Sequence, residues 1–456
     1  MEKESTLLSI VSEISGYIWG PPLLILLVGT GIYLTIRLGF LQFKALPYAL
    51  KLAFSREQDK KSKGDISHYQ ALTTAMAATI GTGNIAGVAT AVVMGGPGAV
   101  LWMWITALLG MATKYAEAIL AVKYRVTNDK GQISGGPMYY LEKGLKAKWL
   151  GVLFAIFGAI AAFGIGNMVQ SNTVSDVLNA SFSFPKWATG IALAVLAALV
   201  ILGGIKSIGR VTAFFVPIMA AFYIIGGIII IILNFDLVPS AISLIFTDAF
   251  TGSAIGGGIL GSVIRYGVAR GVFSNEAGLG SAPIAAAAAR TDYPGRQALV
   301  SMTQVFIDTI LVCSITGITL VMADLYAGGL NGAELTSASF AFFLGDVGSY
   351  IVTIGTIFFA FSTIVGWSYY GEKCFSYLFK DKLIPYYRAL FVLLIFYGAV
   401  ETLDVIWGIA DIMNGLMAFP NLIGLLGLSG VVVAETNRFL KVAKEEKQQK
   451  KLDANI

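Results

Sequence analysis

The run Ala77-Ala78-Thr79-Ile80-Gly81-Thr82-Gly83-Asn84 decides how this chain folds. It lies in an apolar segment, about residues 70–93, that is long enough to cross a bilayer as one helix. Two glycines and an asparagine in mid-span weaken a helix at a depth where lipid offers no partner to exposed backbone groups. A break is tolerated there only where the freed N–H and C=O groups face protein, water or a solute. The run therefore predicts a discontinuous helix whose inner ends hold a polar solute.

The composition places the rest of the chain in the membrane as well. Of the 456 residues, 56% are hydrophobic and 13% are charged, and the mean hydropathy is +0.75, whereas soluble domains are ~25% charged. Apolar runs of spanning length predict an all-α polytopic membrane protein with about 11 transmembrane helices. The predicted spans are residues 18–38, 70–93, 97–123, 150–174, 187–205, 211–233, 255–288, 297–324, 343–370, 386–402 and 405–434.

Lysine and arginine mark alternate connections between these spans. The segments 39–69 and 123–149 are rich in them, whereas 234–254 and 325–342 contain none. By the positive-inside rule, the N-terminus is predicted outside the cell membrane and the C-terminus in the cytoplasm. The formal charge of +5 then comes from lysine and arginine residues beside the membrane and does not indicate a nucleic-acid partner. The two cysteines form no metal or disulfide pattern, and no motif indicates an organic cofactor or an obligate protein partner.

The spans divide into an N-terminal helix and two sets of five. An odd number of helices per set inverts the second set relative to the first. The first span of each set is interrupted, at Gly81–Asn84 and at Gly271–Gly280, which is the best sequence indicator of a transporter binding site. The alternative, that glycines serve close helix packing, is favoured for the other glycine-rich spans. The predicted organisation is a helix at 1–40, inverted repeats at 68–233 and 255–434, and a basic cytoplasmic tail at 435–456.

The chemistry of the first break favours a zwitterion and a cation. Free N–H groups near Thr82 and Gly83 carry the positive end of a helix dipole and suit a carboxylate. Carbonyls near Ala77 and Ile80 carry the negative end and suit Na⁺ or an ammonium group, and the amide oxygen of Asn84 can add one ligand to a hard cation. An amino acid together with Na⁺ satisfies all of these groups.

Three motifs carry a family resemblance. Gly81–Asn84 resembles the first broken helix of LeuT-fold neurotransmitter:sodium symporters. The stretch GGPGAVLWMW at Gly95–Trp104, followed by Gly110, is similar to the signature of the alanine or glycine:cation symporter family, although Leu101 stands where that family commonly has Phe. The stretch Gly271–Ser281 is similar to that family's second broken helix. The resemblance covers nearly the whole chain and implies a LeuT-type core and alternating-access symport of alanine, or glycine, with Na⁺.

The resemblance also implies site residues. The N–H groups of Thr82 and Gly83 would bind the substrate carboxylate, and the carbonyl of Thr79 would take the ammonium group. The ammonium group would also be bound by carbonyls of the second broken helix, those of Gly271, Phe273 and Ser274. The implied sodium ligands are Ala77, Ile80, Phe359, Ser362 and Thr363. For the two hydroxyls, the alternative is a bond to the preceding helical turn.

Further polar residues lie within the predicted spans. Asn84 and Asp308 are candidates for a second ion site. Gln170 contacts either the substrate or a neighbouring helix. Phe273 and Trp367 either form walls that leave room for a small side chain, or belong to ordinary packing.

Charged residues in the spans leave several alternatives open. Lys114 and Glu117, three residues apart, can neutralise each other on one helix face. Arg270 can pair with Glu276 to brace the second break or to form part of a gate, and Arg265 has no assigned role.

Rival functions are less well supported by the sequence. A channel would need a repeated polar pore segment, and a membrane enzyme would need a catalytic motif such as HExxH or GxSxG; the chain has neither. A proton-coupled or exchange transporter of the same fold remains the main alternative, and the hydroxyls of Ser362 and Thr363 favour Na⁺ over it.

Overall fold

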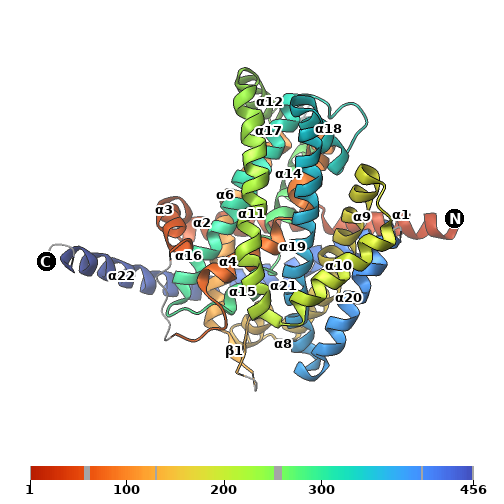
Figure 1. Cartoon of the computed structure of the whole chain (residues 1–456). Helices are drawn as coiled ribbons and strands as arrows, with labels where there is room; N and C mark the ends of the chain where they lie inside the picture. The colour runs from red at the N-terminus through yellow and green to blue at the C-terminus, as the bar shows by residue number, and fades with distance from the viewer. Residues whose placement is uncertain (1, 56–61, 129–130, 251–258, 402–403, 454–456) are drawn as a thin grey trace.

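A computed structural model describes residues 2–55, 62–128, 131–250, 259–401 and 404–453. Over these residues the protein is almost entirely helical, with one short hairpin of β1 (Val126–Thr127) and β2 (Ile133–Ser134). The long helices α11 (Gly204–Leu233) and α19 (Asp346–Phe379) stand upright beside each other, with the hairpin at the lower end of the bundle (Figure 1). The predicted all-α membrane fold is confirmed.

The helices of the first half follow the predicted spans closely. They are α1 (Glu2–Ile18), α2 (Pro21–Arg37), α3 (Leu41–Ala53), α4 (His68–Thr79), the π-helix η1 (Gly83–Gly87), α5 (Val88–Gly95), α6 (Ala99–Lys123), α7 (Pro137–Lys143), α8 (Lys148–Phe163), the π-helix η2 (Gly164–Met168), α9 (Val169–Phe182), α10 (Lys186–Ile201) and α11.

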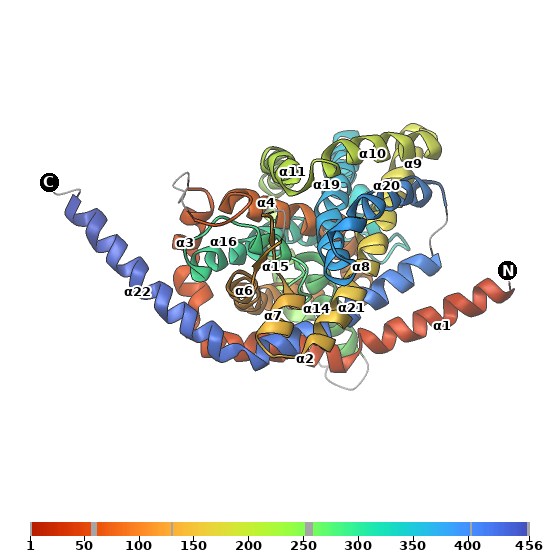
Figure 2. The same cartoon turned by 90° about the horizontal axis from the view of Figure 1, so that it is seen from below.

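The second half has the same helical character. It contains η3 (Phe235–Leu237), α12 (Val238–Asp248), α14 (Ile259–Asn275), α15 (Pro283–Ala287), α16 (Pro294–Val305), the π-helix η4 (Phe306–Cys313), α17 (Ser314–Ala323), α18 (Gly332–Leu344), α19, η5 (Asp381–Leu383), α20 (Ile384–Val400), α21 (Asp404–Gly427) and α22 (Ser429–Asp453). The helices α1 and α22 extend from the bundle toward opposite sides (Figure 2).

The number of membrane crossings can be compared with the prediction. Among the described residues, eight helices are long and apolar enough to cross a membrane, and the bent pair formed by α4 and η1–α5 brings the number to nine. Each predicted span overlaps a helix, but α10 and α14, with 16 and 17 described residues, are not among the helices long enough to cross. The count of eleven and the repeat boundaries therefore stay predictions; residues 1, 129–130, 255–258, 402–403 and 454–456 of those segments lie outside the described residues.

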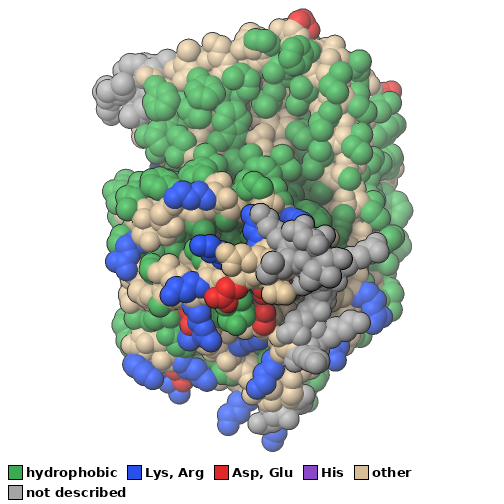
Figure 3. Space-filling view, turned by 90° about the vertical axis from the view of Figure 1, so that its left-hand side faces the viewer, with side chains coloured by type: hydrophobic (Ala, Val, Ile, Leu, Met, Phe, Trp, Pro, Cys, Tyr) green, Lys and Arg blue, Asp and Glu red, His purple; other side chains and the backbone are tan. Residues whose placement is uncertain are grey.

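The surface shows the polarity expected of a membrane protein. On the face drawn in Figure 3, hydrophobic side chains cover the upper part, whereas lysine and arginine side chains gather over the lower part. Exposed apolar residues such as Leu199 on α10 and Phe214 and Ile232 on α11 lie where lipid rather than water would solvate them. The basic end is also the end that carries the hairpin (Figure 1), and this arrangement agrees with the predicted cytoplasmic side.

The first break has the predicted position. Helix α4 ends at Thr79, Ile80 has an extended backbone (φ −75°, ψ 91°), and the following helix is turned by 55° relative to α4. The side-chain oxygen of Asn84 accepts the N–H of Gly81 at 2.9 Å. Hydroxyl groups from other helices satisfy the carbonyls beyond the break, for example Thr316 on the carbonyl of Asn84 at 2.8 Å. The freed backbone groups thus face protein, as the lipid environment requires.

The second break begins later than the sequence predicts. Helix α14 continues through Gly271 to Asn275, and the unwound segment covers residues 276–282, where Glu276, Gly278 and Gly280 have positive φ. Gly271 instead serves close packing, because a Cβ atom there would lie 3.3 Å from the Cα of Met103 in α6. Only the C-terminal part of the predicted interruption is therefore unwound.

Candidate functional site

The α4 end of the first break faces α19. A continuous helix would bond the N–H of Gly81 to the carbonyl of Ala77, but Asn84 accepts that N–H instead. The N–H of Asn84 bonds to Gly81 at 3.2 Å, which leaves the Ile80 carbonyl without its helical partner. Both freed carbonyls point to Ser362, whose hydroxyl lies 3.2 Å from the Ala77 oxygen and 3.4 Å from the Ile80 oxygen.

The sodium ligands implied by the sequence therefore lie together. The hydroxyls of Ser362 and Thr363 each lie 2.9 Å from the carbonyl oxygen of Phe359. A Cβ atom on Gly81 would lie 2.5 Å from the Thr363 hydroxyl, so only glycine allows this approach. Helices α4 and α19 also approach closely one turn further along α19, where a Cβ atom on Gly366 would lie 2.7 Å from the backbone nitrogen of Ala78 in α4. The donor set consists of oxygen atoms alone, which suits a hard cation.

The opposite end of the first break is the N-terminus of a helix. In the described part of the chain, the backbone N–H groups of Thr82 and Gly83 make no hydrogen bond to a side chain or to backbone outside the helices. The Phe273 ring and the Cα of Ser274 each lie 3.3 Å from the position of a Cβ atom on Gly83. This end of the break therefore offers free donors, with the last turn of α14 directly opposite.

The last turn of α14 also has free acceptors. The N–H of Ala277 bonds to the side chain of Asn275, and the N–H of Gly278 bonds to Glu117. The carbonyls of Phe273 and Ser274 thereby lose their helical partners. The Gly271 carbonyl belongs to the regular part of α14, so this predicted ligand is not among the freed groups.

Other predicted substrate contacts have more specific positions. Gln170 donates to the carbonyl of Ile165 at 3.0 Å, and its buried side-chain oxygen has no partner. That oxygen lies 3.7 Å from the Cβ position of Gly81, so it faces the break. The hydroxyl of Thr79 is engaged by α4 and by Gln304, which leaves its carbonyl as the predicted ligand. All of these side chains are buried.

Trp367 lies one turn beyond Thr363 on α19. Its side chain packs against Gly166 in η2, where a Cβ atom would lie 2.2 Å from the tryptophan Cβ, and its ring meets Tyr370 edge-on. The indole is therefore held in a tight slot between α19 and η2. This position is compatible with a wall of the pocket and also with packing alone.

Asn84 and Asp308 are in direct contact. The amide nitrogen of Asn84 donates to the Asp308 carboxylate at 2.8 Å, while its oxygen faces Gly81. Ser274 and Thr309 donate to the other carboxylate oxygen at 2.9 and 2.8 Å. The carboxylate thus receives three donors and links the two broken helices, and the Asn84 oxygen is already engaged.

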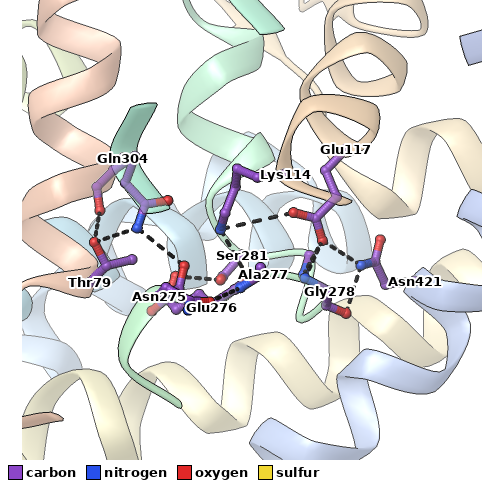
Figure 4. A network of polar contacts seen from close by, with 12 residues as sticks. Thr79, Lys114, Glu117, Asn275, Glu276, Ala277, Gly278, Ser281, Gln304 and Asn421 are labelled. Atoms are coloured by element: carbon purple, nitrogen blue, oxygen red, sulfur yellow. Dashed lines mark hydrogen bonds and ion pairs between the residues drawn. The ribbon is translucent and has the colours of Figure 1, made fainter. Parts of the chain in front are cut away.

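A second polar network supports the unwound segment of α14 (Figure 4). The Glu117 carboxylate accepts the N–H groups of Gly278 and Gly280, each at 3.1 Å, and the amide of Asn421 at 2.7 Å. Lys114 lies 3.9 Å from Glu117 and donates to the Glu276 carbonyl at 3.0 Å. Lys114 and Glu117 are therefore neighbours, as their spacing predicts, and both also bind the unwound backbone.

Glu276 and Gln304 complete the network. The Glu276 carboxylate accepts the hydroxyl of Ser281 at 2.5 Å, and no ion pair joins it to Arg270 in the described part of the chain. Gln304 donates to the Thr79 hydroxyl at 2.9 Å and to the Asn275 carbonyl at 3.1 Å, so it bridges the two breaks (Figure 4). The sequence analysis missed this glutamine; its only signal was an amide four residues before Asp308 in an apolar span.

The hairpin side of the site is closed by Arg125. Its guanidinium donates to the carbonyls of Ala287 and Ala289 at 3.0 and 2.7 Å and to that of Lys63 at 2.9 Å. The backbones of Ile66 and Ala289 also form a bridge beside it. These contacts tie α15 and the residues after it to the segment before α4, so they join parts of both broken helices on the hairpin side.

Comparisons with known proteins agree with this architecture. The model of the sodium:alanine symporter family matches residues 4–454. The chain is 60% identical to the sodium/alanine symporter AgcS of Methanococcus maripaludis, over 96% of this chain and 98% of that protein. It is 36% identical to the amino-acid carrier protein AlsT of Bacillus subtilis, over 97% and 94% of the two chains. The crystal structure of MhsT in complex with L-phenylalanine matches with a TM-score of 0.55 at 16% identity, covering 82% of this chain and 99% of that one.

The likeness to MhsT shows the LeuT-type fold, which confirms the predicted architecture of broken helices. Fold and family together define a sodium-coupled amino-acid symporter in a membrane. The chain belongs to the sodium:alanine symporter family.

Proposed function

We propose that this protein carries alanine, or glycine, into the cell together with Na⁺ by alternating access. The observation that carries the proposal is the geometry of the first break. Asn84 takes the N–H of Gly81, and the freed Ala77 carbonyl then faces the hydroxyl of Ser362. The sodium/alanine symporter named among the relatives supports both the ion and the amino acid.

The sodium site would lie between α4 and α19. Five oxygen atoms are available there, and oxygen is the ligand that hard cations prefer. The Ser362 hydroxyl donates to the carbonyls of Ala77 and Ile80; with Na⁺ bound, it would turn its lone pairs to the ion. The proposed ligands are Ala77, Ile80, Phe359, Ser362 and Thr363.

The substrate site would lie at the outer end of the same break. The N–H groups of Thr82 and Gly83 would bind the carboxylate at the positive end of the helix dipole. The ammonium group would meet acceptors that lack a donor in this structure, and the buried oxygen of Gln170 is one of them. The other proposed acceptors are the carbonyls of Thr79, Phe273 and Ser274.

Phe273 and Trp367 would limit the size of the substrate side chain. Both lie beside glycines, Gly83 and Gly166, whose missing side chains are replaced by the aromatic groups. Discrimination by such walls is worth ~1–3 kcal/mol per methylene, which suits selection of alanine or glycine over larger amino acids.

A second ion at Asn84 and Asp308 stays a weaker proposal. Only the Asp308 carboxylate could supply a charged ligand, because the Asn84 oxygen is engaged by Gly81. An ion there would displace the hydroxyl of Ser274 or Thr309 from the carboxylate. The primary coupling ion is therefore placed at Ser362 and Thr363.

We place the N-terminus outside the cell and the C-terminus in the cytoplasm, which puts the hairpin and Arg125 on the inner side. Release of the substrate inward would then require the Arg125 contacts with α15 to open. One Na⁺ moving inward supplies ~2.3 kcal/mol per 100 mV in addition to its concentration gradient. Coupling requires that the ion and the amino acid stabilise the same closed state.

Uptake of labelled alanine into proteoliposomes tests the proposal. An inward Na⁺ gradient should drive accumulation of alanine, whereas a pH gradient without Na⁺ should not. Accumulation driven equally by the pH gradient would replace Na⁺ with the proton as coupling ion. Equal labelled exchange with and without a gradient would favour an exchanger.

Matched variants of two threonines on α19 locate the ion. Thr363→Val should raise the Na⁺ concentration for half-maximal uptake about tenfold, which corresponds to roughly 1.4 kcal/mol. Thr356→Val is the control, because the Thr356 hydroxyl is buried and, among the described residues, bonds only to Val352 of its own helix. An equal Na⁺ requirement in the two variants would remove Thr363 from the site.

A further inference from the structure

Gln304 on α16 joins the two broken helices where each of them ends (Figure 4). Its amide nitrogen donates at 2.9 Å to the hydroxyl of Thr79, the last residue of α4, and at 3.1 Å to the carbonyl of Asn275, the last residue of α14. The side chain is fully buried. Because a carbonyl can only accept a hydrogen bond, the Asn275 contact fixes the nitrogen end of the amide toward the breaks. One side chain therefore holds the last residue of both helices.

The first arm of this bridge reaches the proposed sodium ligands. The Thr79 hydroxyl donates to the Ala75 carbonyl of its own helix at 3.0 Å, so its oxygen is the atom that accepts from Gln304. Thr79 lies between Ala77 and Ile80, whose carbonyls are the proposed sodium ligands on α4. An ion held by these two carbonyls would fix the end of α4, and with it the hydroxyl that Gln304 contacts.

The second arm reaches the proposed substrate ligands. Asn275 directly follows Phe273 and Ser274, whose carbonyls are proposed to receive the ammonium group. Gln304 holds the Asn275 backbone, and the Asn275 side chain donates to the hydroxyl of Thr309 at 3.1 Å. The position of the last turn of α14 therefore depends on two side chains, five residues apart, of one neighbouring segment.

The π-helix η4 explains how this segment contacts Asn275 twice. In a regular α-helix, residues five apart such as Gln304 and Thr309 lie on different sides. A π-helix bonds residue i to residue i+5, and η4 begins at Phe306, between the two contact residues. The wider turn brings both side chains to the end of α14. Single π-helical turns are frequent at functional sites, and here the turn forms a grip on the second broken helix.

Asp308 provides another link between the broken helices, but it reaches a different part of the first break. Its carboxylate accepts from Asn84 and from the hydroxyl of Ser274. Asn84 belongs to η1, which follows the break, whereas Gln304 contacts α4, which precedes it. Of these two links, the glutamine is the one on which an ion bound to the α4 carbonyls would act directly.

We propose that Gln304 is the positioning residue that couples Na⁺ binding to amino-acid binding. Na⁺ fixes the end of α4, and Gln304 transmits this constraint to the end of α14. The α14 carbonyls are then held in position for the ammonium group. The ion and the amino acid thus favour the same bridged arrangement, which is the condition for coupling. The inference rests on the proposed function, because it takes the positions of both sites from it.

Binding of labelled alanine to the purified full-length protein measures this coupling. The quantity is the ratio of the alanine dissociation constants in choline and in saturating Na⁺. We expect a ratio of about ten or more in the wild type. Gln304→Leu should lower the ratio by about threefold or more, and the two lost hydrogen bonds set an upper limit of about thirtyfold. A merely structural role would weaken alanine binding equally in both solutions and leave the ratio unchanged.

Gln297→Leu is the matched control. Gln297 is a buried glutamine of the same helix; it bonds to His68 at the start of α4 and to Ser301, and within the described residues it makes no hydrogen bond to α14. This variant should keep the wild-type ratio. Thr79→Val, which removes the hydroxyl that accepts from Gln304, should lower the ratio, whereas Thr79→Ser should preserve it. The double variant with Gln304→Leu and Thr79→Val should lose no more coupling than Gln304→Leu alone, because both changes remove one shared contact.

The outcomes separate this inference from the proposed function. A wild-type ratio in Gln304→Leu or in Thr79→Val, an equal fall in Gln297→Leu, or additive losses in the double variant would overturn the inference. Na⁺-driven alanine uptake by wild-type proteoliposomes would then leave the proposed function standing. If Gln304→Leu does not fold, the contrast between Thr79→Val and Thr79→Ser decides.

The converse result is also informative. If wild-type proteoliposomes show no Na⁺-driven alanine uptake, the proposed function fails. Alanine binding that Na⁺ strengthens in the wild type but not in Gln304→Leu would still support the bridge. Alanine binding that does not respond to Na⁺ in the wild type would overturn it.

Discussion

Replacing Asn84 with alanine tests how the first break holds its ion. The variant removes the oxygen that takes the N–H of Gly81 at 2.9 Å, and two donor contacts to Asp308, at 2.8 Å to its carboxylate and 3.2 Å to its carbonyl. A neutral hydrogen bond contributes about 1 kcal/mol and one to a charged group about 1.5–3 kcal/mol. The free energy of unfolding should therefore fall by roughly 3–5 kcal/mol.

The same change should act on the ion separately from stability. The released N–H of Gly81 becomes free to bond the carbonyl of Ala77, as in a continuous helix, and would compete with Na⁺ for that oxygen. A competing bond of about 1–2 kcal/mol raises the Na⁺ concentration for half-maximal alanine uptake about five- to thirtyfold. The assay is alanine uptake into proteoliposomes over a series of Na⁺ concentrations, with folded protein quantified in each sample.

A buried amide elsewhere provides the control. Gln42 in α3 is buried and donates to Thr35 and to the Leu108 carbonyl at 2.9 and 3.3 Å, away from the break. Gln42→Ala should lower stability and leave the Na⁺ requirement unchanged. The reasoning is refuted if folded Asn84→Ala protein takes up alanine with the wild-type Na⁺ requirement, or if Gln42→Ala shifts that requirement equally.

Three further perturbations follow from the packing around the breaks. Gly366→Ala places a methyl group 2.7 Å from the backbone nitrogen of Ala78. Because this methyl group would force α19 away from α4, the free energy of unfolding should fall by about 1–3 kcal/mol, and alanine uptake should require more Na⁺. An unchanged Na⁺ titration would argue against the close approach of the two helices. Glu117→Gln leaves the Lys114 charge unpaired in the interior and should lower the free energy of unfolding by about 3–5 kcal/mol, whereas the double variant with Lys114→Met and Glu117→Leu should lose less stability. Thermal unfolding in detergent compares the two variants. A larger loss of stability in the double variant would contradict the pairing of Lys114 with Glu117. Phe273→Ala should admit larger amino acids, with a gain of up to ~1–3 kcal/mol per methylene; competition of alanine uptake by valine and leucine measures this, and unchanged selectivity would assign the ring to packing.

Much of the architecture could be predicted because membrane physics restricts the sequence. Apolar runs of spanning length and the alternation of basic connections are readable without tertiary contacts. The first break could be placed to within a few residues, since two glycines and Asn84 weaken the helix at a depth where lipid cannot satisfy exposed backbone groups. The second break was placed too early, because glycines allow both unwinding and close packing. Gly271 serves the second purpose, against Met103.

Side-chain partners were less accessible to prediction. The sequence indicates Asn84 as a candidate ion ligand, and in the structure its oxygen accepts the N–H of Gly81 while its nitrogen donates to Asp308. Gln304 and Asn421 were not singled out, although each binds a broken segment. A single amide in an apolar helix gives no sign of which of its neighbours it faces, because that depends on the rotation and tilt of helices far apart in the chain.

The sequence by itself determined that the chain spans a membrane, that two of its helices are interrupted, and which residue types surround the first interruption. These properties follow from local composition, because lipid penalises unsatisfied backbone wherever it occurs. Only the tertiary structure decided that the Ala77 and Ile80 carbonyls are freed by one asparagine and meet the hydroxyls of α19. It also placed Gln304 between Thr79 and Asn275. Such contacts form between helices that are distant in the sequence, and the packing of the whole bundle determines which helices approach each other.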